Sequence, residues 1–437
     1  MNCLHVPKIL MPKEGTDLYK WSVIACDQYT SQPEYWKETE QTVGDAPSTL
    51  KLTLPEVYLG SENETDKVES IHQTMEQYLT DKTLRELPAG FMLVERSFGK
   101  KYARNGLVVE IDLETYEYKK GEHSLIRPTE MTVEERIPPR LRVRQTASLE
   151  LPHIMLLIDD PDCSVIEPLI ARKEQYEKIY DTDLMQKGGR ITGWLIPEGE
   201  ETDRLMSSIE ALADTEVFRK KYNLKEDYPL LNLAVGDGNH SMATAKAAWE
   251  NIKKNLTEEE RENHPARFCL CEIVNVHDRS LEVEPIHRAL FHVDKKELFT
   301  AAQIYYEEKG CEIVIEEGKR AEPAGNDDEH SFCYIDKTGY GMLRVRKPAW
   351  GIAVATLQCF LDEFIAQHSD VKIDYIHGID VTESLGKQEG NLGFLLPDVE
   401  KDDLFKGVIV DGVLPRKTFS MGEANEKRYY MECKKIK

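Results

Sequence analysis

A polar run, residues 236–241, separates an apolar segment from an alanine-rich one, and its residue types suit anion binding. The preceding run, 230–235, is short and apolar, as in a buried strand. Apolar residues then recur at helical spacing from Met242 to Ile252, so the run should lie at a helix N-terminus, where free N–H groups and the helix dipole favour a phosphate. The residues that would bind it are Gly236, Asp237, Gly238, Asn239, His240 and Ser241. An ordinary turn that caps the helix explains the spacing equally well.

Several segments of the chain resemble a known family. They are Gly236–Ser241, Ile24–Tyr29, Leu151–Met155, Ile286–Arg288 and Leu414–Phe419. Together they are similar to the bacterial and archaeal family known as domain of unknown function 1015. That family is distantly similar to the ParB/sulfiredoxin-like nucleotide-binding fold, which includes kinases that phosphorylate free serine. The resemblance therefore implies this fold, with ATP or ADP as a ligand.

The resemblance breaks at two positions of the polar run. Asn239 stands where the family has a first histidine, and Ser241 stands where it has an arginine that would face a phosphate. These departures keep open a second function, in which the chain binds a nucleotide or metabolite as a regulator without turnover.

A second polar turn begins at Asp27, between a predicted strand over 20–25 and a predicted helix over 33–43. If this turn lies beside residues 236–241, Asp27 or Glu56 would accept the proton of a substrate hydroxyl, and His240 would contact the phosphates. Without that adjacency, Asp27 is a capping or turn residue.

Basic residues offer further phosphate contacts. In Leu141–Arg144 apolar and basic residues alternate, which predicts a strand with Arg142 and Arg144 on one face, gripping a phosphate or carboxylate. The alternative is a solvated strand edge. Lys417 would bring positive charge back to the phosphate, unless it belongs to a basic surface loop.

Two acids, Asp159 and Asp160, follow the apolar run 153–158. Ligands of open α/β sheets bind at the carboxyl ends of strands, so this pair is the predicted magnesium site, with a nucleotide's phosphates. Such acids are also a common way to leave a strand and begin a helix. No P-loop motif is present.

Composition sets the outer bounds. The chain has 437 residues, 41% of them hydrophobic, enough for a large core and two or three domains. Its 79 acidic and 56 basic residues give a net charge of −23, which argues against nucleic acid as a partner. No segment is apolar enough to span a membrane and no signal peptide is apparent, so we expect a cytoplasmic protein.

Strand and helix patterns alternate along the chain, which predicts an α/β fold with mixed sheets. We expect a ParB/sulfiredoxin-like core with large insertions over residues 1–292 and a C-terminal α/β region over 293–437. Predicted strands include 91–96, 105–113, 153–158, 191–196, 230–235, 267–275, 332–336 and 341–346. Predicted helices are 67–80, 165–180, 202–222, 240–255, 296–309, 351–367 and 380–386.

The leading hypothesis is a nucleotide-dependent phosphotransferase that uses ATP or ADP with magnesium and acts on a small hydroxylated metabolite such as free serine. The regulatory alternative would bind the same ligands without forming a product.

Overall fold

The computed structural model describes residues 3–30, 32–119, 121–224, 228–281, 283–326, 328–376, 378–398, 401–410, 412–414, 418–422 and 424–437. Within these ranges the chain forms two compact units. Unit 1 comprises Met1–Pro128, Thr132–Leu281 and Gly422–Lys437, and unit 2 comprises Thr129–Met131 and Glu282–Met421. The units therefore divide at 281/282 rather than near 293, and the segment after Met421 belongs to unit 1.

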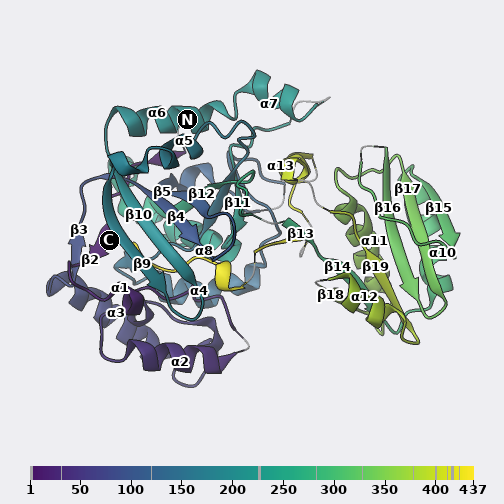
Figure 1. Ribbon diagram of the computed structural model, residues 1–437, viewed down its shortest axis with the longest axis horizontal. Coiled ribbons are helices and arrows are strands. Elements are labelled where there is room, and N and C mark those ends of the chain that lie inside the picture. The colour runs from purple at the N-terminus through teal and green to yellow at the C-terminus, as the bar shows by residue number, and fades with distance from the viewer. Residues whose placement is uncertain are drawn as a thin grey trace. The chain divides into compact units, whose positions relative to one another are not determined.

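Unit 1 is built on one mixed sheet of nine described strands (Figure 1). The order is β6 (Ile126–Pro128), β11 (Leu233–Asp237), β8 (Met155–Ile158), β12 (Phe268–Asn275), β5 (Arg104–Asp112), β4 (Gly90–Ser97), β10 (Gly189–Pro197) and β9 (Glu177–Leu184), with β1 (Leu4–His5) beside β5. β11 runs parallel to β6 and antiparallel to β8. Two short pairs complete the strands, β2 (Leu10–Pro12) with β3 (Leu84–Glu86) and β7 (Leu149–Glu150) with β21 (Lys434–Lys435).

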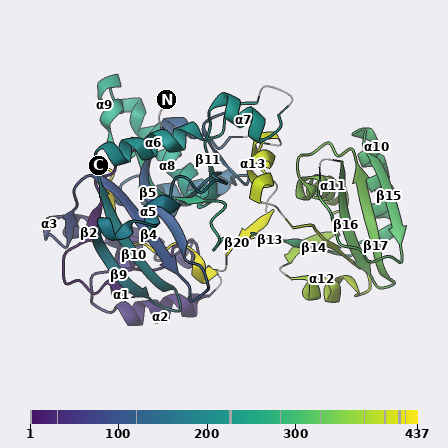
Figure 2. The ribbon, with the colours of Figure 1, turned by 45° about the horizontal axis from the view of Figure 1, so that its top comes forward.

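Helices cover both faces of this sheet because its strands are apolar on both sides. Met92 and Leu93 are adjacent in β4 but belong to different buried clusters, as alternation along a strand requires. The cluster with Met92 includes side chains of α1 (Leu18–Trp21), α2 (Pro33–Val43) and α3 (Glu64–Thr80). The cluster with Leu93 includes side chains of α5 (Glu167–Ile170), α6 (Glu200–Ala211) and α8 (Asn239–Ile252). In Figure 2 α1 and α2 lie below β9 and β10, whereas α6 and α8 lie above them.

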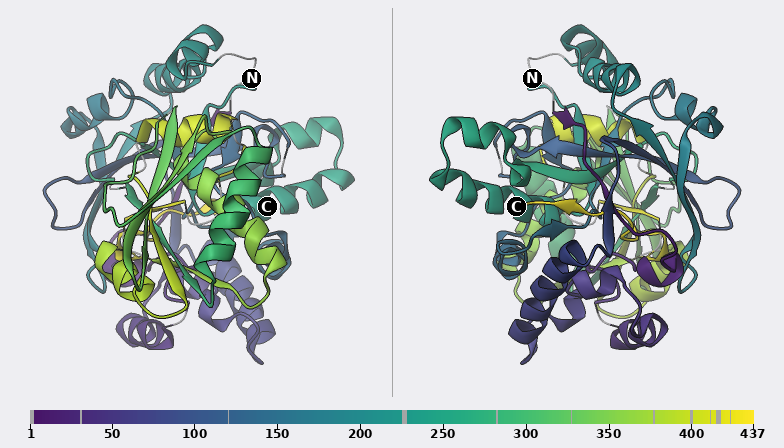
Figure 3. Two further views of the ribbon diagram at one scale, coloured as in Figure 1. Left: turned by 90° about the vertical axis from the view of Figure 1, so that its right-hand side faces the viewer. Right: turned by 90° about the vertical axis from the view of Figure 1, so that its left-hand side faces the viewer.

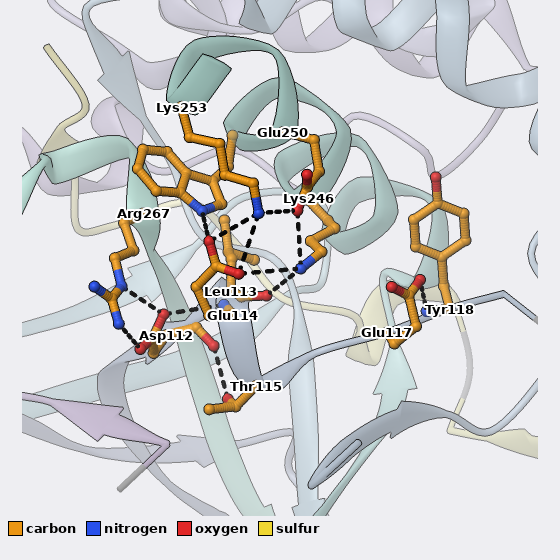
Figure 4. Close-up of polar contacts among 11 residues, drawn as sticks. Asp112, Leu113, Glu114, Thr115, Glu117, Tyr118, Lys246, Glu250, Lys253 and Arg267 are labelled. Carbon is orange, nitrogen blue, oxygen red and sulfur yellow. Dashed lines mark hydrogen bonds and ion pairs between the residues drawn. The ribbon is translucent and has the colours of Figure 1, made fainter. Parts of the chain in front are cut away.

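Helix α8 is fixed to the sheet at the end away from residues 236–241 (Figure 4). The Trp249 indole donates to the Glu114 carboxylate at 2.6 Å, and Lys253 lies 3.0 Å from the same oxygen. The ammonium of buried Lys246 donates to the Leu113 carbonyl at 2.9 Å. Since both partners belong to the 3-10 turn Leu113–Thr115 that directly follows β5, these contacts set the position of the helix.

Unit 2 contains a six-stranded antiparallel sheet (Figure 3, left). Its order is β15 (Glu312–Glu317), β17 (Gly339–Arg346), β16 (Glu329–Asp336), β19 (Asn391–Leu395), β14 (His287–Phe291) and β18 (Lys372–Ile376). α10 (Lys295–Glu308) and α11 (Ala353–Gln367) pack together, with the Tyr306 hydroxyl donating to the Thr356 carbonyl at 2.9 Å. α12 (Ile379–Gly386), α13 (Lys401–Val410) and the pair β13 (Val283–Pro285) and β20 (Phe419–Met421) are its other elements. The expected mixed α/β fold is confirmed.

Three predicted elements outside residues 141–144 are wrong. Residues 20–25 hold the end of α1 and one bridge, Ile24 to Tyr429, instead of a strand. The predicted helix 165–180 contains only α5 and a 3-10 turn, because residues from Glu177 onward pair with β10 as β9. The predicted helix 202–222 is divided into α6 and α7 (Thr215–Lys221), since the Asp214 side chain caps a new helix. α4 (Ile137–Arg144) and α9 (Glu258–Asn263) complete the described helices of unit 1.

No helix in the described ranges is long and apolar enough to cross a membrane.

Candidate functional site

The polar run forms a tight turn between β11 and α8, as its residue types predicted. Pairing of β11 with β8 shifts register between Val235 and Asp237, so Gly236 lies at a bulge. Gly238 has φ +80°, a left-handed conformation, and a Cβ there would lie 3.0 Å from the Ile154 Cα. Only glycine fits both conditions. Gly238 has no side chain to cap the helix, so the first amides of α8, from Asn239 to Ser241, point toward the turn.

Asp237 closes the turn and is paired with a lysine. Its carboxylate accepts the Gly238 amide at 3.0 Å and lies 3.2 Å from the Lys427 ammonium. Burial opposes the charge of Asp237, but Lys427 and, more weakly, His153 outweigh it and hold the pKa of the carboxyl below its usual range. Asp237 is therefore a charged structural group whose negative charge Lys427 offsets.

His240 is neutral at physiological pH. Its Nε2 accepts the Val133 amide at 3.2 Å, which assigns the ring proton to Nδ1 and makes Nδ1 a donor. Burial, followed by the positive charges of Arg140 and Arg136, lowers the pKa of His240 from 6.5 to about 4. Arg140 and Arg136 therefore act on His240 as nearby positive charges, and Asp27 partly opposes their effect.

The side chains of Ser241 and Asp27 both lie near the same ring nitrogen of His153. The Ser241 hydroxyl lies 2.8 Å from His153 Nε2, and an Asp27 carboxylate oxygen lies 3.9 Å from the same atom. The two turns predicted from the sequence are therefore adjacent. The carboxylate comes from the chain after α1, the imidazole from the segment before β8 and the hydroxyl from α8.

The groups on the two sides of the His153 ring assign its tautomer. The Asp27 carboxylate near Nε2 favours a proton on that nitrogen, and the Tyr430 hydroxyl, 3.0 Å from Nδ1, can then donate to the other ring nitrogen. His153 then carries its own proton on Nε2, facing Ser241 and the Asp27 charge. The Ser241 oxygen accepts this proton, which leaves the serine O–H as a donor. Ser241 is thus arranged to donate to an anion, and not to lose its proton as a nucleophile would.

Glu56 lies beside the same site but is engaged by an arginine. Its carboxylate forms an ion pair with Arg140, and its amide donates to the Cys26 carbonyl at 2.8 Å. Burial raises the pKa of Glu56, Arg140 opposes that rise and the charge of Asp27 adds to it. Of the two predicted bases, Asp27 is the one without an arginine partner among the described residues.

The predicted strand carrying Arg142 and Arg144 is wrong. Residues 137–144 form α4, because the prolines at 138 and 139 occupy its first turn, where no intrahelical N–H bond is lost. Residues two apart on a helix point to different sides. Accordingly, Arg142 pairs with Glu64 at 2.9 Å at the surface, whereas Arg144 is engaged by Glu150. The partners of these two arginines, Glu64 and Glu150, are not residues of the turn. The positive charges that act on His240 in the turn are those of Arg140 and Arg136.

The carboxylates of Asp159 and Asp160 are engaged by protein groups. Asp159 binds the Lys221 ammonium at 2.9 Å, the Tyr222 hydroxyl at 2.5 Å and His277 at 2.7 Å. Asp160 accepts the amide of Ser164 at 2.6 Å and that of Val165 at 2.9 Å.

The two acids do follow the carboxyl end of β8, as predicted, but this end lies away from the turn at residues 236–241. β8 is antiparallel to β11, and Asp237 pairs with Met155 at the start of β8. Asp159 follows the end of that strand, about 13 Å further along at 3.3 Å per residue. Asp159 and Asp160 therefore do not fit a magnesium ion at the turn, and no cluster of three or more metal-ligating side chains occurs in the described ranges.

Lys417 lies outside the described residues. The sequence reasoning did not assign roles to His153, Tyr430 or Lys427. A signal existed for His153, because it lies in the segment Leu151–Met155 that resembles the family. For Tyr430 and Lys427 no local signal exists, since both reach the turn from a segment that follows unit 2 in the chain.

The fold and the geometry of the site together define a mixed α/β protein with a polar turn at a helix N-terminus. The chain belongs to the family described as protein of unknown function (DUF1015), whose model matches residues 9–364. No curated protein matches the chain.

Solved structures with some similarity were also found. A free serine kinase mutant in complex with AMP is 12% identical, with a TM-score of 0.38 over 75% of this chain and 92% of that one. A conserved hypothetical protein from Pyrococcus furiosus is 12% identical, with a TM-score of 0.34 over 76% of this chain and 95% of that one. SbnI from Staphylococcus aureus, truncated at its C-terminus, is 8% identical, with a TM-score of 0.34 over 72% and 82%.

Proposed function

We propose that this protein is a nucleotide-dependent phosphotransferase that acts on a small hydroxylated metabolite. One observation carries the proposal: Asp27 and Ser241 meet at His153 Nε2, at the N-terminus of a helix, with the positive charges of Arg136 and Arg140 near His240. This arrangement places a potential base next to a set of donors that suits phosphate.

The donors come from three kinds of group. The first amides of α8 point at the turn, the Ser241 hydroxyl has its proton available, and His240 offers Nδ1–H while uncharged. Donors that are already oriented stabilise a transferring phosphoryl group without reorganising during the reaction. The orientation of Ser241 depends on His153 and Tyr430, which are therefore positioning residues.

In the proposed reaction the acceptor's hydroxyl oxygen forms a bond to the terminal phosphorus of ATP or ADP. The bond from that phosphorus to its bridging oxygen breaks, and the electron pair leaves with the shortened nucleotide. The acceptor's proton passes to the Asp27 carboxylate. Glu56 is the second choice of base, because its ion pair with Arg140 would have to break first. No step uses magnesium at Asp159 or Asp160, since those side chains do not fit it.

In the regulatory alternative, the protein binds a nucleotide or metabolite at the same site but catalyses no reaction. This alternative is favoured by Ser241, which stands where the family has an arginine and so removes one cation from the phosphate. The ParB/sulfiredoxin-like relationship and a cytoplasmic location stay predictions.

Nucleotide binding tests the part that both functions share. ATP or ADP at millimolar concentration should raise the melting temperature of the wild-type protein, because a ligand of the native state stabilises it by mass action. Ser241→Ala should weaken the shift, whereas Ser207→Ala, which removes an exposed hydroxyl of α6, should not. Absence of any shift with the wild-type protein would contradict the nucleotide site.

Product formation separates catalysis from regulation. Phosphorus NMR after incubation with ATP or ADP, magnesium chloride and a panel of hydroxyl amino acids and small alcohols should reveal a phosphorylated product. Asp27→Asn should lower kcat with little change in nucleotide affinity, since a base acts mainly in the transition state. Nucleotide binding without product from any acceptor would support the regulatory function.

A further inference from the structure

A cavity of about 140 Å³ in unit 1 opens directly beside the turn. His153, Ser241 and Glu56 line the part of it that belongs to the candidate site. The rest of its wall is largely apolar, and includes Leu52, Leu54, Met75, Ala147, Leu149 and Leu270. All six of these side chains are buried, and they belong to the core cluster that includes Met92 and side chains of α3. The proposed function uses only the polar end of this cavity.

The charges on the wall are already neutralised. Arg140 is paired with Glu56, and Arg144 is paired with Glu150, so each cation that lines the cavity has its own carboxylate. A charged group placed against the apolar part of the wall would lose water without gaining a free partner of opposite charge, at a cost in desolvation. The cavity therefore suits an uncharged, apolar group.

The volume limits the size of that group. A cavity of roughly 150 Å³ lined by aliphatic and aromatic side chains binds benzene in another protein. A single six-membered ring or a branched aliphatic chain of similar size would thus fill the cavity described here. The side chain of free serine has one carbon and would leave the space empty, whereas a purine is larger and has polar edges that this wall does not satisfy.

We propose that the acceptor of the phosphotransfer carries one apolar ring or a branched aliphatic group that fills this cavity, with its hydroxyl directed at Asp27 and Ser241. This inference rests on the proposed function and specifies its substrate class. Free serine would then be a poor acceptor compared with an aryl or branched-alkyl alcohol.

The cavity can be tested with benzyl alcohol as a probe, by saturation-transfer NMR on the full chain. We expect binding to the wild-type protein and at least tenfold weaker binding to Ala147→Leu, which adds three carbons to the wall. Ala211→Leu adds the same carbons at an exposed position of α6 and should bind like the wild type. The melting-temperature shift caused by ATP should be the same in all three proteins.

If Ala147→Leu does not fold, Leu54→Ala takes its place, because it enlarges the cavity and should admit 1-naphthylmethanol, which the wild-type protein should exclude. The inference is wrong if benzyl alcohol does not bind, if adenosine displaces it, or if L-serine is phosphorylated faster than benzyl alcohol. Binding of benzyl alcohol as expected, with no phosphorylated product from any acceptor, would overturn the phosphotransferase and leave the apolar binding site in place.

Discussion

The low pKa of His240 predicts a specific dependence of stability on pH. The ring has a pKa of about 4 in the folded protein against 6.5 in an unfolded chain, so between these pH values the unfolded state binds one proton more. Stability contributed by the neutral ring is then fully present above pH 6.5 and is lost as the pH falls toward 4. The slope within this window is about 1.4 kcal/mol per pH unit.

The expected magnitude follows from these two values. Between pH 8 and pH 5 the free energy of unfolding should fall by about 2 kcal/mol on account of His240 alone. Because the side chain is only half-buried, solvent screening reduces this to about 1 to 1.5 kcal/mol. His240→Gln keeps an acceptor for the Val133 amide but cannot be protonated, and should therefore lack this part of the loss.

Urea denaturation of both proteins at several pH values between 5 and 8 measures the difference, in which other titrating groups cancel. His368→Gln is a useful control, because the bond to the Phe364 carbonyl, with Glu297 nearby, raises the pKa of His368 and its contribution must be lost with rising pH instead. Equal pH dependence for His240→Gln and wild type, or an NMR titration that places the pKa of His240 at 6.5 or above, would refute the effects of burial and of the nearby arginines on His240.

Three further predictions concern the turn, the core and nucleic acid. Gly238→Val should abolish nucleotide binding and destabilise unit 1 by about 2 to 5 kcal/mol in urea denaturation, from backbone strain and overpacking; Gly15→Ala, also left-handed but with open space around it, should retain binding. Arg428→Met should cost about 3 to 5 kcal/mol by the same assay or prevent folding, because it leaves buried Glu272 without its partner, whereas Lys337→Met at an exposed pair should change little. Duplex DNA should show no gel retardation at physiological salt, since the net charge is −23, and a clear salt-sensitive shift would contradict this.

The sequence predicted the part of the site that is local in the chain. The apolar run, the two glycines and the alanine-rich helical pattern determine the turn at residues 236–241, and they depend on neighbours within a few positions. The helix expected over 240–255 is observed as Asn239–Ile252. Asp27 could be singled out because it too follows an apolar segment, although that segment is not a strand.

The remaining site residues depend on contacts that no local pattern encodes. The bond between Tyr430 and His153 joins residues 277 positions apart. For Arg142 and Arg144 the alternation of apolar and basic residues predicted a strand, but residues 141–144 are the end of a helix whose first turn contains Pro138 and Pro139. The magnesium site was predicted because Asp159 and Asp160 follow the carboxyl end of a strand, but the groups that engage these acids, such as Lys221 and His277, come from distant parts of the chain.

The return of the chain to unit 1 after Met421 has a consequence for biosynthesis. Tyr429, Tyr430 and Met431 are buried in the core beneath the sheet, yet a ribosome makes them only after unit 2 has been translated. Domains fold as units during synthesis, from the N-terminal side. The earlier part of unit 1 therefore has an incomplete core, without Lys427 or Tyr430, until unit 2 has been synthesised. The proposed phosphate site would therefore be among the last features to form, and a nascent chain released before residue 422 would lack Lys427 and Tyr430.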